Sequence, residues 1–167
     1  MERTVVVAAF ILVLFGVAGV RPLLADEQMV ALPEADAKVL WTHIHGPSPY
    51  WNWNKWPGKP GLYKGTEPHG MLLQTFVNEI AQRGVYGKTG GVDHGGIVVK
   101  ENYTPDRTLA AVTVMYKVNG FNPEAGDWFW VKYGPDGAVI KTGKPAGCIA
   151  CHGTKKDNDY LMTSPIK

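Results

Sequence analysis

The sequence predicts an α+β fold in which an antiparallel β-sheet is flanked by helices. Three observations indicate this class. Helix-like patterns come before residue 85, four strand-like runs follow between residues 97 and 142, and the connections between these runs are short. Short connections join antiparallel neighbours, whereas parallel strands need long crossover segments. We therefore expect an antiparallel meander with helices packed against it.

Residues 1–25 have the composition of an export signal. Arg3 precedes residues 5–20, a continuous run without a charged side chain. This run is slightly shorter than the roughly 18 residues of a membrane span, and it suits the apolar region of a signal peptide. Cleavage is expected after Ala25, although Leu23 stands where a small residue is usual. We expect residues 1–25 to be a signal peptide, or alternatively an uncleaved anchor, that delivers the protein to the periplasm.

The remaining residues, 26–167, are expected to form a single domain. A segment of this length can bury a core without structural disulfides. Residues 1–25 contain Arg3, Arg21 and Glu2, so their removal changes the net charge from +2 to +1. A nearly neutral protein gives no reason to expect nucleic-acid binding. No membrane attachment is expected unless the signal stays uncleaved.

Helices are expected over residues 33–41 and 70–84. The first has proline in its first turn with acidic residues close behind, which is typical of a helix N-terminus. In the second, the apolar residues recur on one helical face, and Gly84 suits a C-terminal end. Residues 47–70, which are rich in proline, glycine and tryptophan, are expected to form an ordered loop.

Four strands are expected next, because runs rich in β-branched and aromatic residues are separated by turn residues. These strands are residues 97–103, 108–118, 127–133 and 138–142. Residues 104–107 and 134–137 contain the proline, aspartate and glycine of tight turns, and residues 119–126 form a longer polar loop.

The most specific motif is Cys148-Ile149-Ala150-Cys151-His152, which contains the only two cysteines of the chain. Two thiols at this spacing can each form a thioether with a vinyl group of one haem, and the adjacent histidine can ligate the iron. We therefore expect one haem c near the C-terminus, attached through Cys148 and Cys151, with His152 as the proximal iron ligand.

Two other uses of a Cys-x-x-Cys pair fit the sequence less well. A thioredoxin-like redox pair normally lies within a βαβ pattern, and none is recognisable around residues 148–152. A structural zinc site needs a fourth ligand, and the sequence has no second cysteine–histidine cluster. The motif also follows the strands, whereas familiar small helical cytochromes c carry it near the N-terminus. A sheet-based cytochrome is therefore favoured.

With this motif in place, the chain resembles the cytochrome P-460 family. The resemblance also includes Gly-Ile-Val-Val-Lys-Glu-Asn-Tyr at residues 96–103, Asp-Trp-Phe-Trp at residues 127–130 and the Pro68-His69-Gly70 step. It implies a periplasmic, sheet-based c-type cytochrome that is usually a homodimer. The best-known members oxidise hydroxylamine and have a lysine amine bonded to a meso carbon of their haem. The related beta-type cytochromes c-prime lack this bond and bind nitric oxide or carbon monoxide.

The resemblance implies that Lys100 is the crosslinking lysine, and hence a catalytic and cofactor-binding residue. Strand alternation puts Val98, Lys100 and Asn102 on one face and Ile97, Val99 and Glu101 on the other. Both faces contain apolar residues, so the sequence does not decide which of them meets the haem. An exposed strand lysine is the alternative.

The resemblance leaves the side chain above the iron undetermined. A carboxylate there would take protons from a substrate, and Glu101, Glu124 and Asp127 are candidates; an apolar ring, as in the gas-binding relatives, would come from Phe121 or Phe129. A sixth iron ligand would come from His43, His45, His69, His94, Met71, Met115 or Met162, with His69 preferred because it directly precedes an expected helix and imidazole is a common metal ligand.

Three functions are compatible with these patterns. The preferred one is an oxidoreductase that acts on hydroxylamine or a similar small nitrogen compound and passes electrons to an external acceptor protein. The alternatives are a protein that binds nitric oxide or carbon monoxide without turnover, and a monohaem electron carrier with both axial positions filled. A second copy of the chain is the other expected partner, since the resemblance implies a homodimer.

Overall fold

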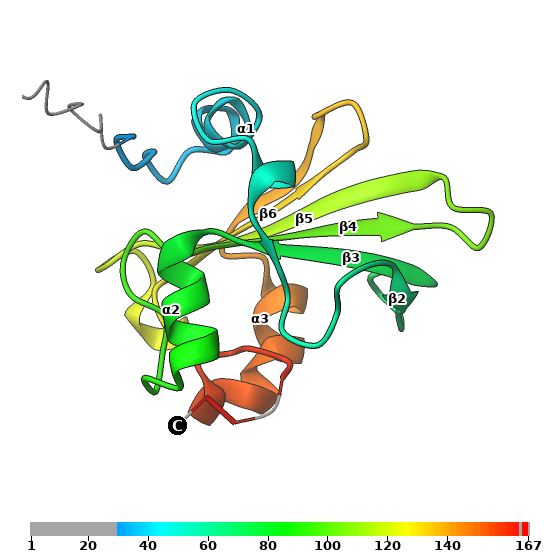
Figure 1. The fold of residues 1–167 in the computed structure, drawn as a ribbon. Helices are drawn as coiled ribbons and strands as arrows, with labels where there is room; N and C mark the ends of the chain where they lie inside the picture. The colour runs from blue at the N-terminus through cyan, green and yellow to red at the C-terminus, as the bar shows by residue number, and fades with distance from the viewer. Residues whose placement is uncertain (1–29, 164, 167) are drawn as a thin grey trace, which may run out of the picture.

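The computed structural model describes residues 30–163 and 165–166 of the chain. This part contains a seven-stranded antiparallel sheet with the order β1-β3-β4-β5-β6-β7, and β2 also pairs with β3. Figure 1 shows the sheet with α1 on one side and α2 and α3 on the other. The α+β class, with helices flanking an antiparallel sheet, is thus confirmed.

The strands are β1 (Asn54–Lys55), β2 (Tyr63–Lys64), β3 (Leu72–Val77), β4 (Ile97–Tyr103), β5 (Leu109–Lys117), β6 (Trp128–Tyr133) and β7 (Val139–Gly143). The helices are α1 (Ala37–His45), α2 (Glu79–Gly87) and α3 (Ala146–His152), with short 3-10 turns η1 (Tyr50–Asn52), η2 (Pro123–Ala125) and η3 (Gly153–Asn158).

The four strands expected between residues 97 and 142 are β4 to β7, and their bounds differ from the expectation by at most one residue. They pair consecutively, as the short connections predicted. The first expected helix lies further along the chain than residues 33–41. It begins at Ala37 because the Asp36 carboxylate accepts hydrogen bonds from the backbone N–H groups of Lys38 and Val39, at 2.8 and 3.0 Å.

The helix expected over residues 70–84 was wrong. This segment contains β3, a turn at Asn78, and then α2, which continues past Gly84 to Gly87. β3 pairs with β4 along all six of its residues and with β1 and β2 on its other side, so its backbone hydrogen bonds are satisfied as a central strand. Gly84 lies inside α2 because its missing Cβ lets the helix approach Gly91 and Val92 closely.

The sheet separates two apolar cores. On one face, the fully buried Leu40 and Ile44 of α1 pack against Ile97 and Val99 of β4. On the other face, Val98 of β4 packs with residues of α2, α3 and the C-terminal segment. Each fully buried aliphatic side chain contributes roughly 1.5–3 kcal/mol. The sequence left open which face of β4 meets the Cys-x-x-Cys-His motif. The structure shows that it is the face that carries Val98 and Lys100, because α3 covers this face.

The C-terminal segment after α3 is tied to the sheet by polar contacts. Lys117 of β5 forms a buried ion pair with Asp159 and also donates to the backbone oxygen of Gly126 at 2.7 Å. Trp128 of β6 donates through Nε1 to the backbone oxygen of Asp159 at 2.9 Å, and Val92 N–H donates to the Asp159 carboxylate at 2.7 Å. These contacts fix the segment that lies beside α3.

Within the described residues, no helix combines the length and apolar character that a bilayer crossing requires. The expected signal peptide, residues 1–25, lies outside the described part of the chain.

Candidate functional site

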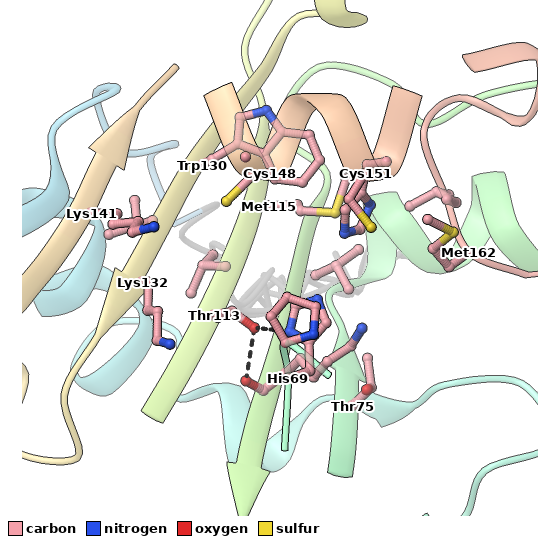
Figure 2. Close-up of a pocket in the computed structure, with 18 of the residues that line it drawn as sticks. His69, Thr75, Thr113, Met115, Trp130, Lys132, Lys141, Cys148, Cys151 and Met162 are labelled. Carbon is pink, nitrogen blue, oxygen red and sulfur yellow. Dashed lines mark hydrogen bonds between the residues drawn. The ribbon is translucent and has the colours of Figure 1, made fainter. Parts of the chain in front are cut away.

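A cavity of about 300 Å³ lies between the sheet and α3. Figure 2 shows side chains from the sheet and from α3 converging on it. The β-sheet forms its floor, and α3 together with Leu161 and Met162 forms the opposite wall. The cavity is within the size range of small-molecule and cofactor sites, near its lower end.

The three residues of the Cys-x-x-Cys-His motif all line this cavity. α3 begins after Pro145, and its helical geometry puts Cys148 and Cys151 one turn apart on neighbouring positions of one face. The two thiols are free rather than joined in a disulfide. Burial raises the pKa of the Cys148 thiol, which keeps it protonated.

His152 is held with one ring nitrogen available to a metal. Its side chain is buried, and its Nδ1–H donates to the backbone oxygen of Tyr160 at 2.8 Å. A carbonyl can only accept, so the proton is on Nδ1 and the lone pair is on Nε2. Burial lowers the pKa of His152, which favours the neutral ligand form.

Lys100 lies on the floor of the cavity and is partly buried. Burial lowers the pKa of its amine to about 8. The alternative of a fully exposed lysine is therefore wrong. The structure brings together all four residues that the sequence singled out, since Lys100, Cys148, Cys151 and His152 line the same cavity.

Lys100 belongs to a polar row that crosses five strands. Its neighbour on β3 is Thr75, and on the other side the pairing continues through Thr113 of β5 and Lys132 of β6 to Lys141 of β7. All five side chains line the cavity. Apart from Lys100, this row was not predicted from the sequence, because it depends on the register between strands.

A second row beside it is apolar. Val98, Met115 and Trp130 are neighbours on β4, β5 and β6, and all three line the cavity. The floor therefore combines an apolar strip with a strip that contains three lysines.

The residues present fit a haem. Two thiols one helical turn apart match its two vinyl groups, and an imidazole with a free Nε2 matches its iron. Its apolar ring suits the row of Val98, Met115 and Trp130. Lys132 and Lys141 are directly opposite each other, an arrangement that is unfavourable for like charges unless an anion lies nearby. The two carboxylates of a haem would supply such anions.

None of the carboxylates and phenylalanine rings that the sequence offered for the position above the iron lines the cavity. Glu101 points to the face covered by α1, where Tyr50 and Tyr103 each donate a hydrogen bond to its carboxylate at 2.8 Å. Asp127 accepts from the backbone N–H of Asn122 at 3.0 Å in a turn, and Glu124 lies in η2. The prediction that one of these carboxylates lies above the iron was therefore wrong. Strand alternation turns Glu101 to the other face of the sheet, and Glu124 and Asp127 lie in turns outside the cavity.

The two candidate aromatic rings are also elsewhere. Phe121 and Phe129 pack edge to face against each other, with ring centroids 5.2 Å apart, in the core beneath α1. In the part of the chain that the structure describes, the residues lining the cavity include no aspartate or glutamate.

His69 is the histidine, besides His152, that lines the cavity. It comes from the turn between β2 and β3, and its Nδ1 lies 3.1 Å from the Asn102 side-chain oxygen. Burial, together with the positive charge of Lys100, lowers its pKa to about 4.

Of the methionines offered as iron ligands, Met115 and Met162 line the cavity and Met71 does not. Among residues 30–163 and 165–166, no group of three or more His, Cys, Asp or Glu side chains is arranged to hold a metal ion.

Comparison with known proteins agrees with this geometry. A family model described as Cytochrome P460 matches residues 47–163, which span the whole sheet, α3 and the motif. None of the curated proteins compared with the chain matches it. The match covers well over half of the chain and includes all four of the site residues predicted from the sequence. The chain therefore belongs to the cytochrome P460 family of haem-binding cytochromes.

Proposed function

We propose that this protein is a periplasmic c-type cytochrome that oxidises hydroxylamine or a similar small nitrogen compound. The observation that carries the proposal is the position of Lys100 on the floor of the same cavity that Cys148, Cys151 and His152 line. The family resemblance assigns the crosslinking lysine to this residue, and a lysine pointing away from the cavity could not serve.

In this proposal Cys148 and Cys151 form thioethers to the haem and His152 holds the iron through Nε2. The haem supplies an iron position for the substrate and accepts its electrons. A bond from the Lys100 amine to a meso carbon replaces an N–H and a C–H bond, releases two protons and passes two electrons to an external oxidant such as hydrogen peroxide. The neutral amine is the nucleophilic form that this reaction needs. With a pKa of about 8, roughly one amine in ten is neutral at pH 7, compared with fewer than one in a thousand for an ordinary lysine.

A second candidate function is the binding of nitric oxide or carbon monoxide without turnover. The observation that favours it is the lack of an aspartate or glutamate among the described residues that line the cavity. Without a carboxylate, the proton acceptor expected for hydroxylamine oxidation is missing from its usual place.

Peptide mapping of the purified holoprotein separates the two candidates. For the oxidase we expect the peptide with Lys100 to travel with the haem, and we expect hydroxylamine to be consumed when an electron acceptor is present. The Lys100→Met variant should lose both properties. The matched control Lys64→Met, on the exposed strand β2, should keep them. A free Lys100 peptide and no consumption of hydroxylamine, with retained nitric oxide binding, would favour the gas-binding function.

The remaining parts of the proposal come from the resemblance and from the composition of residues 1–25. They are export to the periplasm, a homodimer, and an external protein that accepts the electrons. Fractionation of cells that express the full chain and light scattering of the purified product test the first two. Recovery of a monomer, or of holoprotein only in the cytoplasm, would contradict them.

A further inference from the structure

The two imidazoles of the cavity are placed like a pair of axial ligands. The ring centroids of His69 and His152 are 6.1 Å apart, and their planes make an angle of 84°. An imidazole nitrogen binds a metal ion at about 2.0–2.1 Å, so two imidazoles on opposite sides of one ion have ring centres roughly 6 Å apart. The observed separation therefore matches that of two imidazoles on opposite sides of one iron.

Hydrogen bonds leave the Nε2 atom of His69 free for a metal. The Asn102 side-chain NH₂ donates to the backbone oxygens of Lys100 and Ala111, at 2.8 and 3.1 Å. These contacts fix the orientation of the amide, so its oxygen faces Nδ1 of His69. Because this oxygen only accepts, Nδ1 carries the proton and the lone pair is on Nε2.

His69 and His152 thus have the same arrangement, in which Nδ1–H donates to a fixed oxygen and Nε2 is available. Metal-ligating histidines usually make such a contact through their second nitrogen, because it sets the tautomer and the ring orientation. Asn102 is itself buried and belongs to β4, so the support for His69 comes from the sheet rather than from its own turn.

The turn that carries His69 is more exposed to solvent than the strands β3 and β4 beside it. Thr66, Glu67 and Pro68 are exposed, and the backbone N–H of His69 donates to Thr66 within the turn, at 3.1 Å. A segment with so few buried contacts can open locally at a small free-energy cost. Opening of this turn would take His69 out of the cavity while β3 and β4 stay paired.

We propose that His69 is the second axial ligand of the iron in the resting protein, and that a small molecule binds the iron only when His69 leaves. In this exchange the bond between iron and Nε2 of His69 breaks and a bond to the incoming molecule forms, without a change of oxidation state. The inference rests on the haem assignment of the proposed function and is independent of the substrate.

Absorption and electron paramagnetic resonance spectra of the ferric holoprotein test the ligation. We expect low-spin, six-coordinate iron in the wild type and mainly high-spin iron in His69→Ala. Free imidazole should restore the low-spin spectrum in the variant. The matched control His94→Ala, which changes an exposed histidine outside the cavity, should keep the wild-type spectrum. Met115→Leu and Met162→Leu should keep it as well.

Stopped-flow binding of carbon monoxide to the ferrous protein tests whether a small molecule reaches the iron only after His69 leaves. In the wild type we expect a rate that becomes independent of carbon monoxide concentration, because departure of His69 limits it. In His69→Ala the rate should rise linearly and be at least tenfold higher at the highest concentration. Equal and linear rates in both proteins would overturn the proposal.

The wild-type spectrum alone keeps the proposal falsifiable if His69→Ala does not yield holoprotein. The near-perpendicular ring planes predict the strongly anisotropic low-spin resonance of such imidazole pairs. High-spin ferric iron in the wild type would overturn the proposal, and so would an unchanged low-spin spectrum in His69→Ala. Failure to oxidise hydroxylamine would contradict the proposed function while leaving these readouts intact.

Discussion

Lys100 illustrates what single positions of the sequence determine and what they leave open. Alternation along β4 separates Lys100 from Glu101, but Val98 and Val99 make both faces apolar. The choice between the faces depends on the helices, since α1 covers Val99 and α3 covers Val98. Such long-range packing is not encoded in a local pattern. The cysteines and His152 could be singled out from the sequence because the motif is defined by spacing alone, and the structure brings all three to one cavity.

The position of His69 opposite His152 could not be predicted from the sequence. The sequence marked His69 only as the preferred member of a group of histidines and methionines. Its distance to His152 and its contact with Asn102 come from the pairing of β3 with β4. Cross-strand register also creates the polar row of the cavity floor, which no single strand reveals.

The first prediction concerns the charge on Lys100. In the haem-free chain its pKa is about 8, below the unfolded value of about 10.4, so the unfolded state binds more protons between these two pH values. The free energy of unfolding should therefore rise with pH from about 8 to 10.4. Lys100→Met should remove this rise and be more stable than the wild type at pH 7, by on the order of 1–3 kcal/mol.

Urea unfolding at pH 7 and pH 10.5 measures this difference, which should nearly vanish at the higher pH because the amine is then neutral in both states. A Lys100→Met variant that is less stable at pH 7 would contradict the prediction. Lys64→Met is the control, since Lys64 is exposed.

The second prediction concerns Asn102, which orients His69. Asn102→Leu removes the acceptor of the Nδ1 proton, so the low-spin fraction of the ferric holoprotein should fall. It also removes the side-chain hydrogen bond to the backbone oxygen of Ala111, which costs about 1 kcal/mol. Absorption spectra and thermal unfolding measure the two effects. Asn122→Leu is a matched control, because Asn122 is also buried but lies outside the cavity lining, and it should keep the wild-type spin state. Equal spectra in all three proteins would refute the role of Asn102.

At the scale of elements, the strands after residue 97 were predicted well and β3 was not. Leu73 and Val77 are four residues apart and fit one face of a helix, yet Leu73, Thr75 and Val77 also alternate and are all buried. Six residues are too few to separate the two periods. The better signal was Asn78, whose side chain accepts from the backbone N–H of Ala81 and starts α2.

The third prediction concerns the anchor of the C-terminal segment. Asp159→Asn leaves the Lys117 ammonium buried without its counter-charge, which costs about 3–5 kcal/mol. Asparagine tolerates the positive φ of 54° at this position, so the backbone is not strained by the change. Because Tyr160 follows Asp159 and accepts the Nδ1 proton of His152, the variant should also perturb the spectrum of the iron.

Chemical unfolding of Asp159→Asn and of the double variant Lys117→Met/Asp159→Asn measures the loss in the free energy of unfolding. The double variant should regain much of the lost stability, since no charge is then left unpaired. Asp157→Asn, which changes an exposed residue of η3, should stay within about 0.5 kcal/mol of the wild type. A loss below about 1 kcal/mol in Asp159→Asn would show that the ion pair does not anchor the segment.

At the scale of the whole molecule, the sheet has two faces with different tasks. The face under α1 is a closed apolar core, and the opposite face combines a smaller core with the cavity. The α+β class followed from the order of patterns along the chain, and the family match confirms it over residues 47–163. The location of the cavity could not be predicted in this way, because it depends on where α3 and the C-terminal segment pack.

Intact mass and peptide mapping of the purified holoprotein test the central claim most directly. We predict one haem per chain, carried by the peptide that contains Cys148 and Cys151, and its loss in the Cys148→Ser/Cys151→Ser variant. A colourless product from cells with a competent haem-attachment system, or a peptide in which the two sulfurs are bonded to each other, would contradict the account.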